Sequence, residues 1–147
     1  MANGHEPTKI ELIVIGGTWS ALPAAYKYWY IKECFRAANE FKGVILEPKA
    51  IESQVFTPNN KMRCYREVYP PLANSSMTKL RKLLGQEQKK NENAKYKIIG
   101  ITLETRPDYI DEKELLEMRE LGATRVEMGV QALDDEILAK NKRGHGV

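Results

Sequence analysis

The chain has 147 residues, a length that suits one domain with a hydrophobic core of its own. Its hydrophobic content of 42% and charged content of 29% are ordinary for a globular protein, and its net charge of +3 permits a nucleic-acid partner without indicating one. No apolar run approaches the roughly 20 residues that cross a bilayer, and the first residues lack the apolar core of a signal peptide. The composition therefore excludes a membrane-spanning protein and predicts a cytoplasmic one.

The two cysteines, Cys34 and Cys64, are far apart in the sequence, and neither belongs to a CxxC motif. This spacing supports neither a disulfide framework nor a cysteine-bound metal site. Cys34 falls within an amphipathic helical pattern, which predicts a buried and unreactive thiol. We therefore expect no metal ligand in this chain.

The first predicted unit covers residues 10–42 and consists of a strand, a turn and a helix. Ile10–Ile15 is a short apolar run, typical of a strand that is covered on both faces. Gly16-Gly17-Thr18 follows it, and then Ser20 is a possible helix cap and Pro23 suits a first helical turn. The helix is expected to stop at Gly43. Its apolar residues recur at helical spacing: Ile31, Cys34, Phe35, Ala38 and Phe41.

The second segment, residues 43–97, is predicted to be an insertion followed by connecting helices. Residues 43–76 contain four of the seven prolines and no sustained hydrophobic period, as in a long loop. Ser75 or Ser76 could cap a helix that Gly85 interrupts, and a second, solvated helix is expected within Gln86–Lys97. The apolar residues of the first of these helices are Met77, Leu80, Leu83 and Leu84.

The third segment, residues 98–147, is predicted to be a strand–helix–strand–helix unit. Ile98–Thr105 is its first strand, which Pro107 stops. Asp108 or Asp111 then caps a helix that Gly122 closes. The residues expected to face inward from that helix are Leu115, Met118 and Leu121.

The last predicted elements are a strand over Arg125–Gln131 and a helix from Asp134 to about Asn141. The order of elements along the chain implies parallel strands joined by right-handed crossovers. Three strands are few for such a sheet and leave both of its edges open. We therefore expect this α/β chain to be one piece of a larger domain.

Both of the later strands alternate between an apolar face and a polar face. The apolar faces consist of Ile99, Ile101 and Leu103 in one strand and of Val126, Met128 and Val130 in the other. The opposite faces consist of Gly100, Thr102 and Glu104, and of Arg125, Glu127, Gly129 and Gln131. If helices cover the apolar faces, the polar faces line an interior, as in a barrel that encloses a polar ligand.

Carboxylates on such a face require a partner, because an unpaired buried charge is costly. Glu104 and Glu127 could pair with Arg106, with Arg125 or with a cationic ligand. For Glu127, in the middle of its strand, a structural ion pair is the favoured interpretation. For Glu104 and Gln131, at strand ends, contact with a ligand is favoured, because chemistry in parallel sheets gathers there.

The Gly16-Gly17-Thr18 turn lies between a strand and a helix. Glycines in this position let backbone N–H groups approach a ligand closely. Taken alone the turn is weak, since it matches neither dinucleotide-binding nor phosphate-binding motifs, and a tight turn explains it equally well. Residue type alone predicts that the side chains of Arg143 and His145 lie on the surface, exposed to solvent.

Four strings of this chain resemble the radical S-adenosylmethionine (SAM) domain of the catalytic subunit of Elongator. They are GHEPTKIELIVIGGTWSALPAAY, NENAKYKIIGITLETRPDYI, LGATRVEMGVQALDDEIL and KRGHGV, and together they cover about two-thirds of the chain. That family modifies the wobble uridine of tRNA. Its fold is a partial barrel of six βα units that holds a 4Fe-4S cluster and SAM.

The resemblance implies that this chain is part of one radical SAM domain, with the second to fourth strands of the partial barrel and a long insertion. It also implies which residues contact SAM: the turn Gly16, Gly17 and Thr18, together with Glu104, Gln131 and Arg143. No residue of this chain is assigned a catalytic role.

The chain departs from the family pattern in two respects. It lacks the three closely spaced cysteines that ligate the cluster and the acetyltransferase domain that binds acetyl-CoA. The resemblance then implies that the whole protein transfers an acetyl-derived group to carbon 5 of the tRNA uridine, with SAM, a 4Fe-4S cluster and acetyl-CoA. Expected partners are tRNA and either other Elongator subunits or a second copy. This segment alone is expected to be inactive and to bind SAM weakly or not at all.

Two rival interpretations stay open. One is a fragment of a radical SAM enzyme of the porphyrin-oxidase type, and the other is a non-catalytic tRNA-binding remnant.

Overall fold

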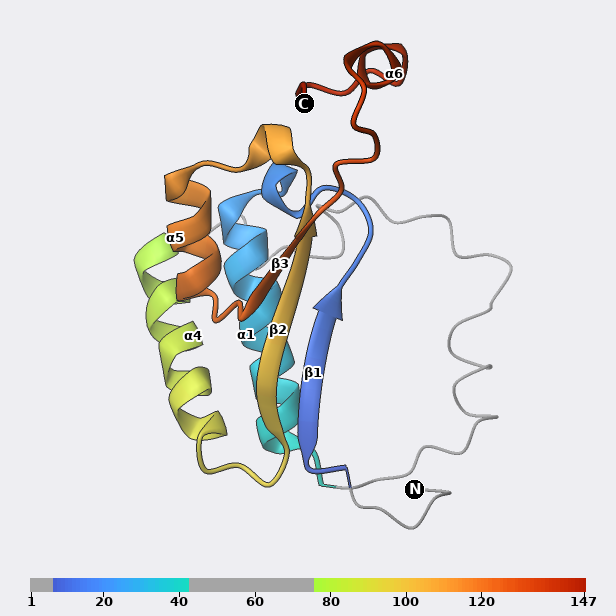
Figure 1. Cartoon of the computed structure of the whole chain (residues 1–147). Coiled ribbons are helices and arrows are strands. Elements are labelled where there is room, and N and C mark those ends of the chain that lie inside the picture. Colours follow the sequence, from blue (N-terminus) through green and yellow to red (C-terminus); the bar gives the residue numbers. More distant parts are fainter. Residues whose placement is uncertain (1–6, 43–75) are drawn as a thin grey trace, which may run out of the picture.

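The computed structural model describes residues 7–42 and 76–147 and contains one parallel sheet. Its strands are β1 (Lys9–Val14), β2 (Lys97–Thr105) and β3 (Arg125–Met128), in the order β1-β2-β3 (Figure 1). The helices are α1 (Ala24–Glu40), α4 (Met77–Asn91), α5 (Glu112–Glu120) and α6 (Asp135–Lys140). Short 3-10 turns occur at η1 (Trp19–Ala21) and η3 (Pro107–Tyr109). The prediction of an α/β chain with three parallel strands is confirmed.

Four predictions fall outside the described residues: the long loop before Ser76, the helix stop at Gly43, the alternative cap at Ser75, and the absence of a disulfide or metal role for Cys64. Within 7–42 and 76–147, no helix is both long and apolar enough to cross a membrane.

The core lies on one face of the sheet, where α1, α4 and α5 pack (Figure 1). Leu12 and Val14 of β1 pack against this core, but Ile13 between them is half exposed. The prediction that this strand is covered on both faces is therefore wrong, because the described helices cover only one. The buried core consists of Trp19, Tyr28, Ile31, Phe35, Leu80, Leu84, Ile101, Leu103, Met118 and Leu121.

A bulge in β2 changes which of its residues face the core. Ile10 pairs with Ile98, but the next residue, Glu11, pairs with Gly100, so that Ile99 is the extra residue. Ile99 is 58% exposed, and Ile98 packs against the core instead. The predicted inward positions of Ile101 and Leu103 are confirmed, whereas that of Ile99 is wrong.

The third strand is shorter than predicted and is covered only at its start. Val126 packs against the core, whereas Met128 is 53% exposed and Val130 is exposed. The strand ends at Met128, and Gln131 then adopts a positive φ of 73° that an extended strand cannot accommodate. The helix-facing positions predicted for Met128 and Val130 are therefore wrong.

Helix α4 runs unbroken through Gly85, so the predicted interruption and the separate helix within Gln86–Lys97 are both wrong. A glycine in a helix interior costs about 1 kcal/mol relative to alanine. Burial of Leu80 and Leu84 against α1 and the sheet outweighs this cost. Ser76 occupies the N-cap position, but its side chain makes no cap hydrogen bond.

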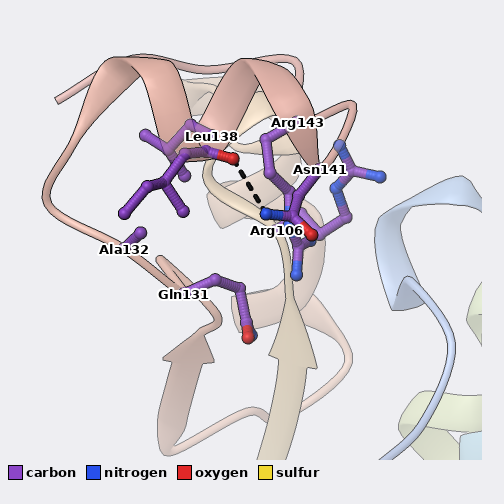
Figure 2. A pocket seen from close by; sticks show the side chains of 7 residues that line it. Arg106, Gln131, Ala132, Leu138, Asn141 and Arg143 are labelled. Carbon is purple, nitrogen blue, oxygen red and sulfur yellow. Dashed lines mark hydrogen bonds between the residues drawn. The ribbon is translucent and has the colours of Figure 1, made fainter.

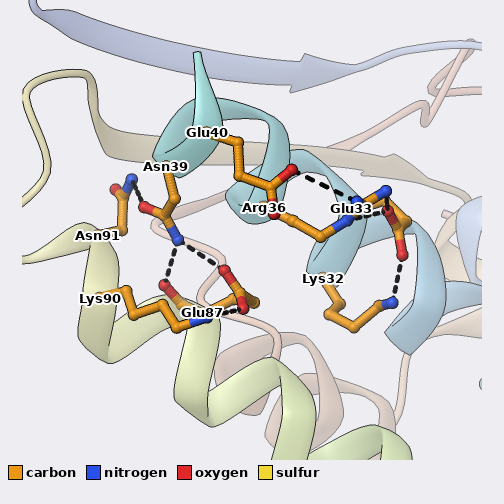
Figure 3. Close-up of polar contacts among 8 residues, drawn as sticks. All are labelled: Lys32, Glu33, Arg36, Asn39, Glu40, Glu87, Lys90 and Asn91. Carbon is orange, nitrogen blue, oxygen red and sulfur yellow. Dashed lines mark hydrogen bonds and ion pairs between the residues drawn. The ribbon is translucent and has the colours of Figure 1, made fainter. Parts of the chain in front are cut away.

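Polar side chains fix the end of α4 to α1 (Figure 3), and Asn91 also fixes it to the start of β2. Asn91 is buried, and its Nδ2 donates to Asn39 Oδ1 at 2.7 Å and to the Tyr96 carbonyl at 3.0 Å. Its Oδ1 accepts from the Ile98 N–H at 2.7 Å. Asn39 Nδ2 donates in turn to Glu87 Oε2 at 2.8 Å. The buried side-chain amide of Asn91 thus provides hydrogen bonds to polar groups of α1, of the turn after α4 and of β2.

Local chemistry sets the other helix starts. Asp111 caps α5 by accepting from the Glu114 N–H at 2.7 Å, and Asp134 caps α6 by accepting from the Ile137 N–H at 2.9 Å. Of the two predicted caps for α5, Asp111 is thus the one used. Met118 and Leu121 are buried as predicted, but Leu115 is half exposed.

Ser20 does not cap α1. Pro23 occupies the N-cap position, and the Ser20 hydroxyl instead shares a hydrogen bond of 2.8 Å with the Thr105 hydroxyl at the end of β2. The turn after β1 is thereby tied to the neighbouring strand.

Candidate functional site

The carboxyl ends of the three parallel strands lie at one edge of the sheet (Figure 1). The glycine turn follows β1, the segment from Glu104 to Asp108 ends β2, and Gly129 to Gln131 follow β3. Because parallel strands end on the same side, segments distant in sequence share this edge. All six residues predicted to contact SAM belong to these segments or, for Arg143, to the segment after α6.

The glycine turn has a backbone that other residues rarely adopt. Gly16 and Gly17 have φ values of +96° and +69°, and a Cβ added to either would meet nothing within 4 Å. These glycines are therefore required by the backbone conformation rather than by lack of space. Thr18 follows as the N-cap of η1, where its carbonyl accepts from the Ala21 N–H at 3.0 Å.

A hydrogen bond joins this turn to Glu104 in β2. The Gly16 N–H donates to Glu104 Oε2 at 3.1 Å, across 88 residues of sequence. Arg106, a predicted partner of Glu104, pairs instead with Asp108, with Nε to Oδ1 at 2.9 Å and Nη2 to Oδ2 at 2.6 Å. Among the described side chains, Glu104 therefore has no cationic partner and can offer one carboxylate oxygen to a ligand.

The charge of Asp108 is maintained by that pairing. Burial alone would raise the pKa of Asp108, but the hydrogen bonds and positive charge of Arg106 outweigh it and lower the pKa below its usual value. The pairing of Arg106 with Asp108, two residues away, was not predicted from the sequence.

The ion pair predicted for Glu127 is confirmed on the open face of the sheet. Arg125 Nη1 lies 3.8 Å from Glu127 Oε1, and Arg125 Nη2 lies 3.5 Å from Glu11 Oε1. All three side chains are about half exposed, so this ladder contributes little to stability.

A pocket of about 350 Å³ brings Gln131 and Arg143 together (Figure 2). Arg143 reaches it because its backbone N–H donates to the Leu138 carbonyl at 2.9 Å, after Lys142 has turned the chain with a φ of +53°. The pocket is lined by Arg106, Gln131, Ala132, Ile137, Leu138, Asn141 and Arg143. Its lining holds no carboxylate, and because Arg106 is already paired with Asp108, an anionic group in the pocket would be bound by Arg143.

The six predicted residues thus form two adjoining groups. Gly16 and Glu104 are hydrogen-bonded to each other, and Gln131 and Arg143 line one pocket. Arg106 connects them in the chain, since it follows Glu104 by two residues and lines the pocket. Sequence reasoning missed Arg106 as a pocket residue, although it lies in the ETRPD string, and nothing in the sequence indicated Asn141.

No group of three or more metal-ligating side chains occurs in the described parts of the chain. Cys34 is half buried in α1, where it lines an apolar hollow with residues such as Ile10, Leu12 and Phe41. Burial raises the pKa of its thiol, which makes the thiol less reactive.

Comparison with known proteins identifies relatives of this arrangement. Residues 70–147 match the radical SAM superfamily. The structure is similar to that of an archaeal Elp3 from Methanocaldococcus infernus with an N-terminal deletion, with a TM-score of 0.66 and 37% sequence identity. The match covers 99% of this chain and 25% of that protein.

Proteins with sequences similar to this chain carry two names, tRNA uridine(34) acetyltransferase and Elongator complex protein 3. A tRNA uridine(34) acetyltransferase of Methanocaldococcus infernus is 39% identical over 144 residues, which cover 98% of this chain and 20% of the relative. A tRNA uridine(34) acetyltransferase of Dehalococcoides mccartyi is 32% identical, and the match covers 98% of this chain and 23% of that protein. Elongator complex protein 3 of Homo sapiens is 31% identical, and the match covers 98% of this chain and 19% of that protein. This chain therefore spans about a fifth of the length of these relatives.

Proposed function

Because this chain belongs to the radical SAM superfamily, we propose that the carboxyl ends of its strands hold part of a SAM molecule. Membership in this superfamily implies SAM and a 4Fe-4S cluster as cofactors. The residues proposed to hold SAM are Gly16, Gly17, Thr18, Glu104, Gln131 and Arg143. The observation that carries the proposal is the pocket that joins Gln131 to Arg143 beside the end of β2.

The chemistry of this donor set matches SAM. The methionine end of SAM carries a carboxylate and an ammonium group, and its sulfonium is also cationic. Arg143 can donate to the carboxylate, and Glu104 can accept from the ammonium group. The left-handed turn at Gly16 and Gly17 leaves open space for a ligand to approach the backbone. A volume of about 350 Å³ suits part of a small ligand.

The cluster does not fit the residues of this chain. The family pattern requires three closely spaced cysteines, and this chain has two, of which Cys34 lies in a helix and lines an apolar hollow. We assign the cluster ligands to the remainder of the whole protein. Bound SAM supplies radical chemistry to such enzymes, and this chain contributes its binding and orientation.

For the whole protein we propose modification of tRNA at uridine 34, with acetyl-CoA as the source of the transferred group. This proposal follows the names of the relatives, which are tRNA uridine(34) acetyltransferases and Elongator complex protein 3. tRNA is then the macromolecular substrate, and assembly with other subunits and a cytoplasmic location belong to the same proposal.

Titration of the 147-residue chain with SAM, followed by amide NMR, tests the proposed pocket. The sequence left two outcomes open, weak binding or none. The pocket between Gln131 and Arg143 favours weak binding, with a Kd of about 1 mM or above, because the chain supplies only part of the site. The amide signals of Gly16, Gly17, Glu104, Gln131 and Arg143 should shift. Arg143→Gln should weaken binding about tenfold, since it removes a charge-assisted hydrogen bond.

The matched control is Lys140→Gln, which removes the same charge from an exposed position on α6. It should bind SAM like the parent chain. No shift at these amides at about 5 mM SAM, or equal weakening by both variants, would contradict the proposal. Salt-dependent tRNA binding in the absence of a SAM response would favour the non-catalytic interpretation instead.

A further inference from the structure

We propose that His145 and Asp108 are positioning residues, which hold residues 142–147 as a strap across the ends of β2 and β3 and thereby fix Arg143 and Gln131 at the pocket. The identity of the ligand in this proposal rests on the proposed function. The strap itself rests on contacts within the chain and can be tested without a ligand.

The imidazole of His145 lies between the two strand ends. Its Nε2 lies 3.3 Å from the Val130 carbonyl, and its Nδ1 lies 3.8 Å from Asp108 Oδ1. The side chain is only 10% exposed, and Nδ1 has no hydrogen-bond partner among the described residues. With its proton on Nε2, the imidazole can donate to the Val130 carbonyl, while Nδ1 faces the Asp108 carboxylate. The prediction that His145 is solvated surface is therefore wrong.

The neighbours of His145 are glycines because the strap lies close to two aspartates. A Cβ on Gly144 would lie 2.5 Å from Asp108 Oδ2, and a Cβ on Gly146 would lie 2.9 Å from Asp135 Oδ1. The first aspartate cannot move aside freely, since Arg106 holds both of its oxygens. The glycines on either side of His145 thus let the backbone approach Asp108 at Gly144 and Asp135 at Gly146.

Backbone hydrogen bonds hold the strap on both sides of the histidine. The Arg143 N–H donates to the Leu138 carbonyl, and the Val147 N–H donates to Asp135 Oδ1, both at 2.9 Å. The strap therefore contacts the segment after β2 at Asp108, the segment after β3 at Val130, and the start of α6 at Asp135.

His145 and Asp108 act on the pocket through its lining residues, because neither lines it. Asp108 holds the guanidinium of Arg106, which does line it. His145 contacts the carbonyl of Val130, and the next residue is Gln131 with its positive φ of 73°. Loss of the imidazole should therefore release the strap and let Arg143 and Gln131 move apart.

The test compares His145→Ala with His145→Gln in the 147-residue chain, without any ligand. For His145→Ala we expect amide hydrogen exchange at Arg143 and Val147 to become about tenfold faster, with unchanged exchange in β2. The NMR signals of the Arg143 Nε–H and the Gln131 side-chain amide should shift as well. His145→Gln should restore most of the protection, because its amide can still donate toward the Val130 carbonyl.

A glycine pair tests the close approach independently. Gly144→Ala should displace the strap, whereas Gly85→Ala adds the same methyl group where nothing lies within 4 Å and should leave the strap unchanged. The strap is overturned if exchange at Arg143 and Val147 is the same in His145→Ala, Gly144→Ala and Gly85→Ala. It is also overturned if the side-chain signals of Arg143 and Gln131 do not respond.

The strap and the proposed SAM pocket are tested by separate measurements, so either can be overturned without the other. All strap measurements are made without SAM, so they decide the positioning role of His145 and the close approach of the strap to Asp108 independently of the ligand. A parent chain that shows no SAM response would overturn the proposed ligand, and the strap would still stand on its own measurements.

Discussion

Tyr28 is fully buried in α1, and its hydroxyl meets two other helices. It donates to Glu120 Oε2 of α5 at 2.6 Å and accepts from Arg81 Nε of α4 at 3.3 Å. The Arg81 guanidinium also lies over the ring, 5.3 Å from its centre. Burial, followed by the hydrogen bond to Glu120, raises the pKa of Tyr28 to about 12. This side chain therefore resists deprotonation in the folded chain.

The raised pKa predicts a loss of stability at alkaline pH. Between about pH 10 and pH 12 the folded chain keeps the phenol proton that the unfolded chain has lost. The free energy of unfolding should be unaffected by Tyr28 below pH 10 and should fall as pH rises through that window, by about 2 kcal/mol in total. Urea unfolding at a series of pH values measures this directly.

Tyr28→Phe is the control for this prediction. It removes the titrating hydroxyl and should flatten the decline, although Tyr30 and Cys34, whose pKa values are also raised, still contribute to it. Parallel declines for the parent chain and Tyr28→Phe would contradict the assignment.

Among the secondary-structure elements, those set by local chemistry were predictable from the sequence. The cap at Asp111 is one of the two that residue type predicted, and the acidic start of α6 and the three strands also follow from local residue patterns. Local patterns failed at Ser20 and Ser76, which make no cap hydrogen bond. The bulge at Ile99 was not predictable, because strand register depends on pairing with β1, which lies far away in the sequence. The helix break predicted at Gly85 was wrong because the low helix propensity of one glycine costs less free energy than burial of the apolar face of α4 contributes.

The residues of the candidate site also divide into those that could be predicted from the sequence and those that could not. Strand alternation and strand ends indicated Glu104 and Gln131, whereas the selection of Arg143 required the resemblance to a known family. The burial of His145 depends on how the segments after β2, β3 and α6 meet at the edge of the sheet. No local pattern in the sequence encodes such a meeting.

Helix α4 provides a test of its own. Gly85 has no positive φ and open space around its Cβ direction, so Gly85→Ala should stabilise the chain by about 0.5–1 kcal/mol. Gly122 is the matched control, since its φ is +92° and a Cβ would lie 3.2 Å from Gln88 Nε2. Gly122→Ala should therefore destabilise the chain. Urea unfolding of the two variants gives opposite signs if α4 is continuous, and a destabilising Gly85→Ala would contradict that continuity.

The molecule as a whole is a sheet with described helices on one face only (Figure 1). Its opposite face carries the Glu11–Arg125–Glu127 ladder, and Ile13 and Ile99 are at least half exposed. β1 and β3 are the edges of the three-stranded sheet. Exposed apolar residues beside open strand edges favour association with another chain.

We therefore expect the 147-residue chain to self-associate in a concentration-dependent manner, through the face and edges of its sheet that the described helices leave open. Sedimentation velocity at increasing protein concentration should show a rising mean mass. Ile13→Lys should reduce this association, because it places a charge on the edge strand β1, on the face that no described helix covers. The control Leu133→Lys adds the same charge to a residue that is 83% exposed but lies outside the sheet, just before α6, and should leave association unchanged. A monomer at all concentrations, or equal effects of the two lysines, would show that the sheet does not mediate association.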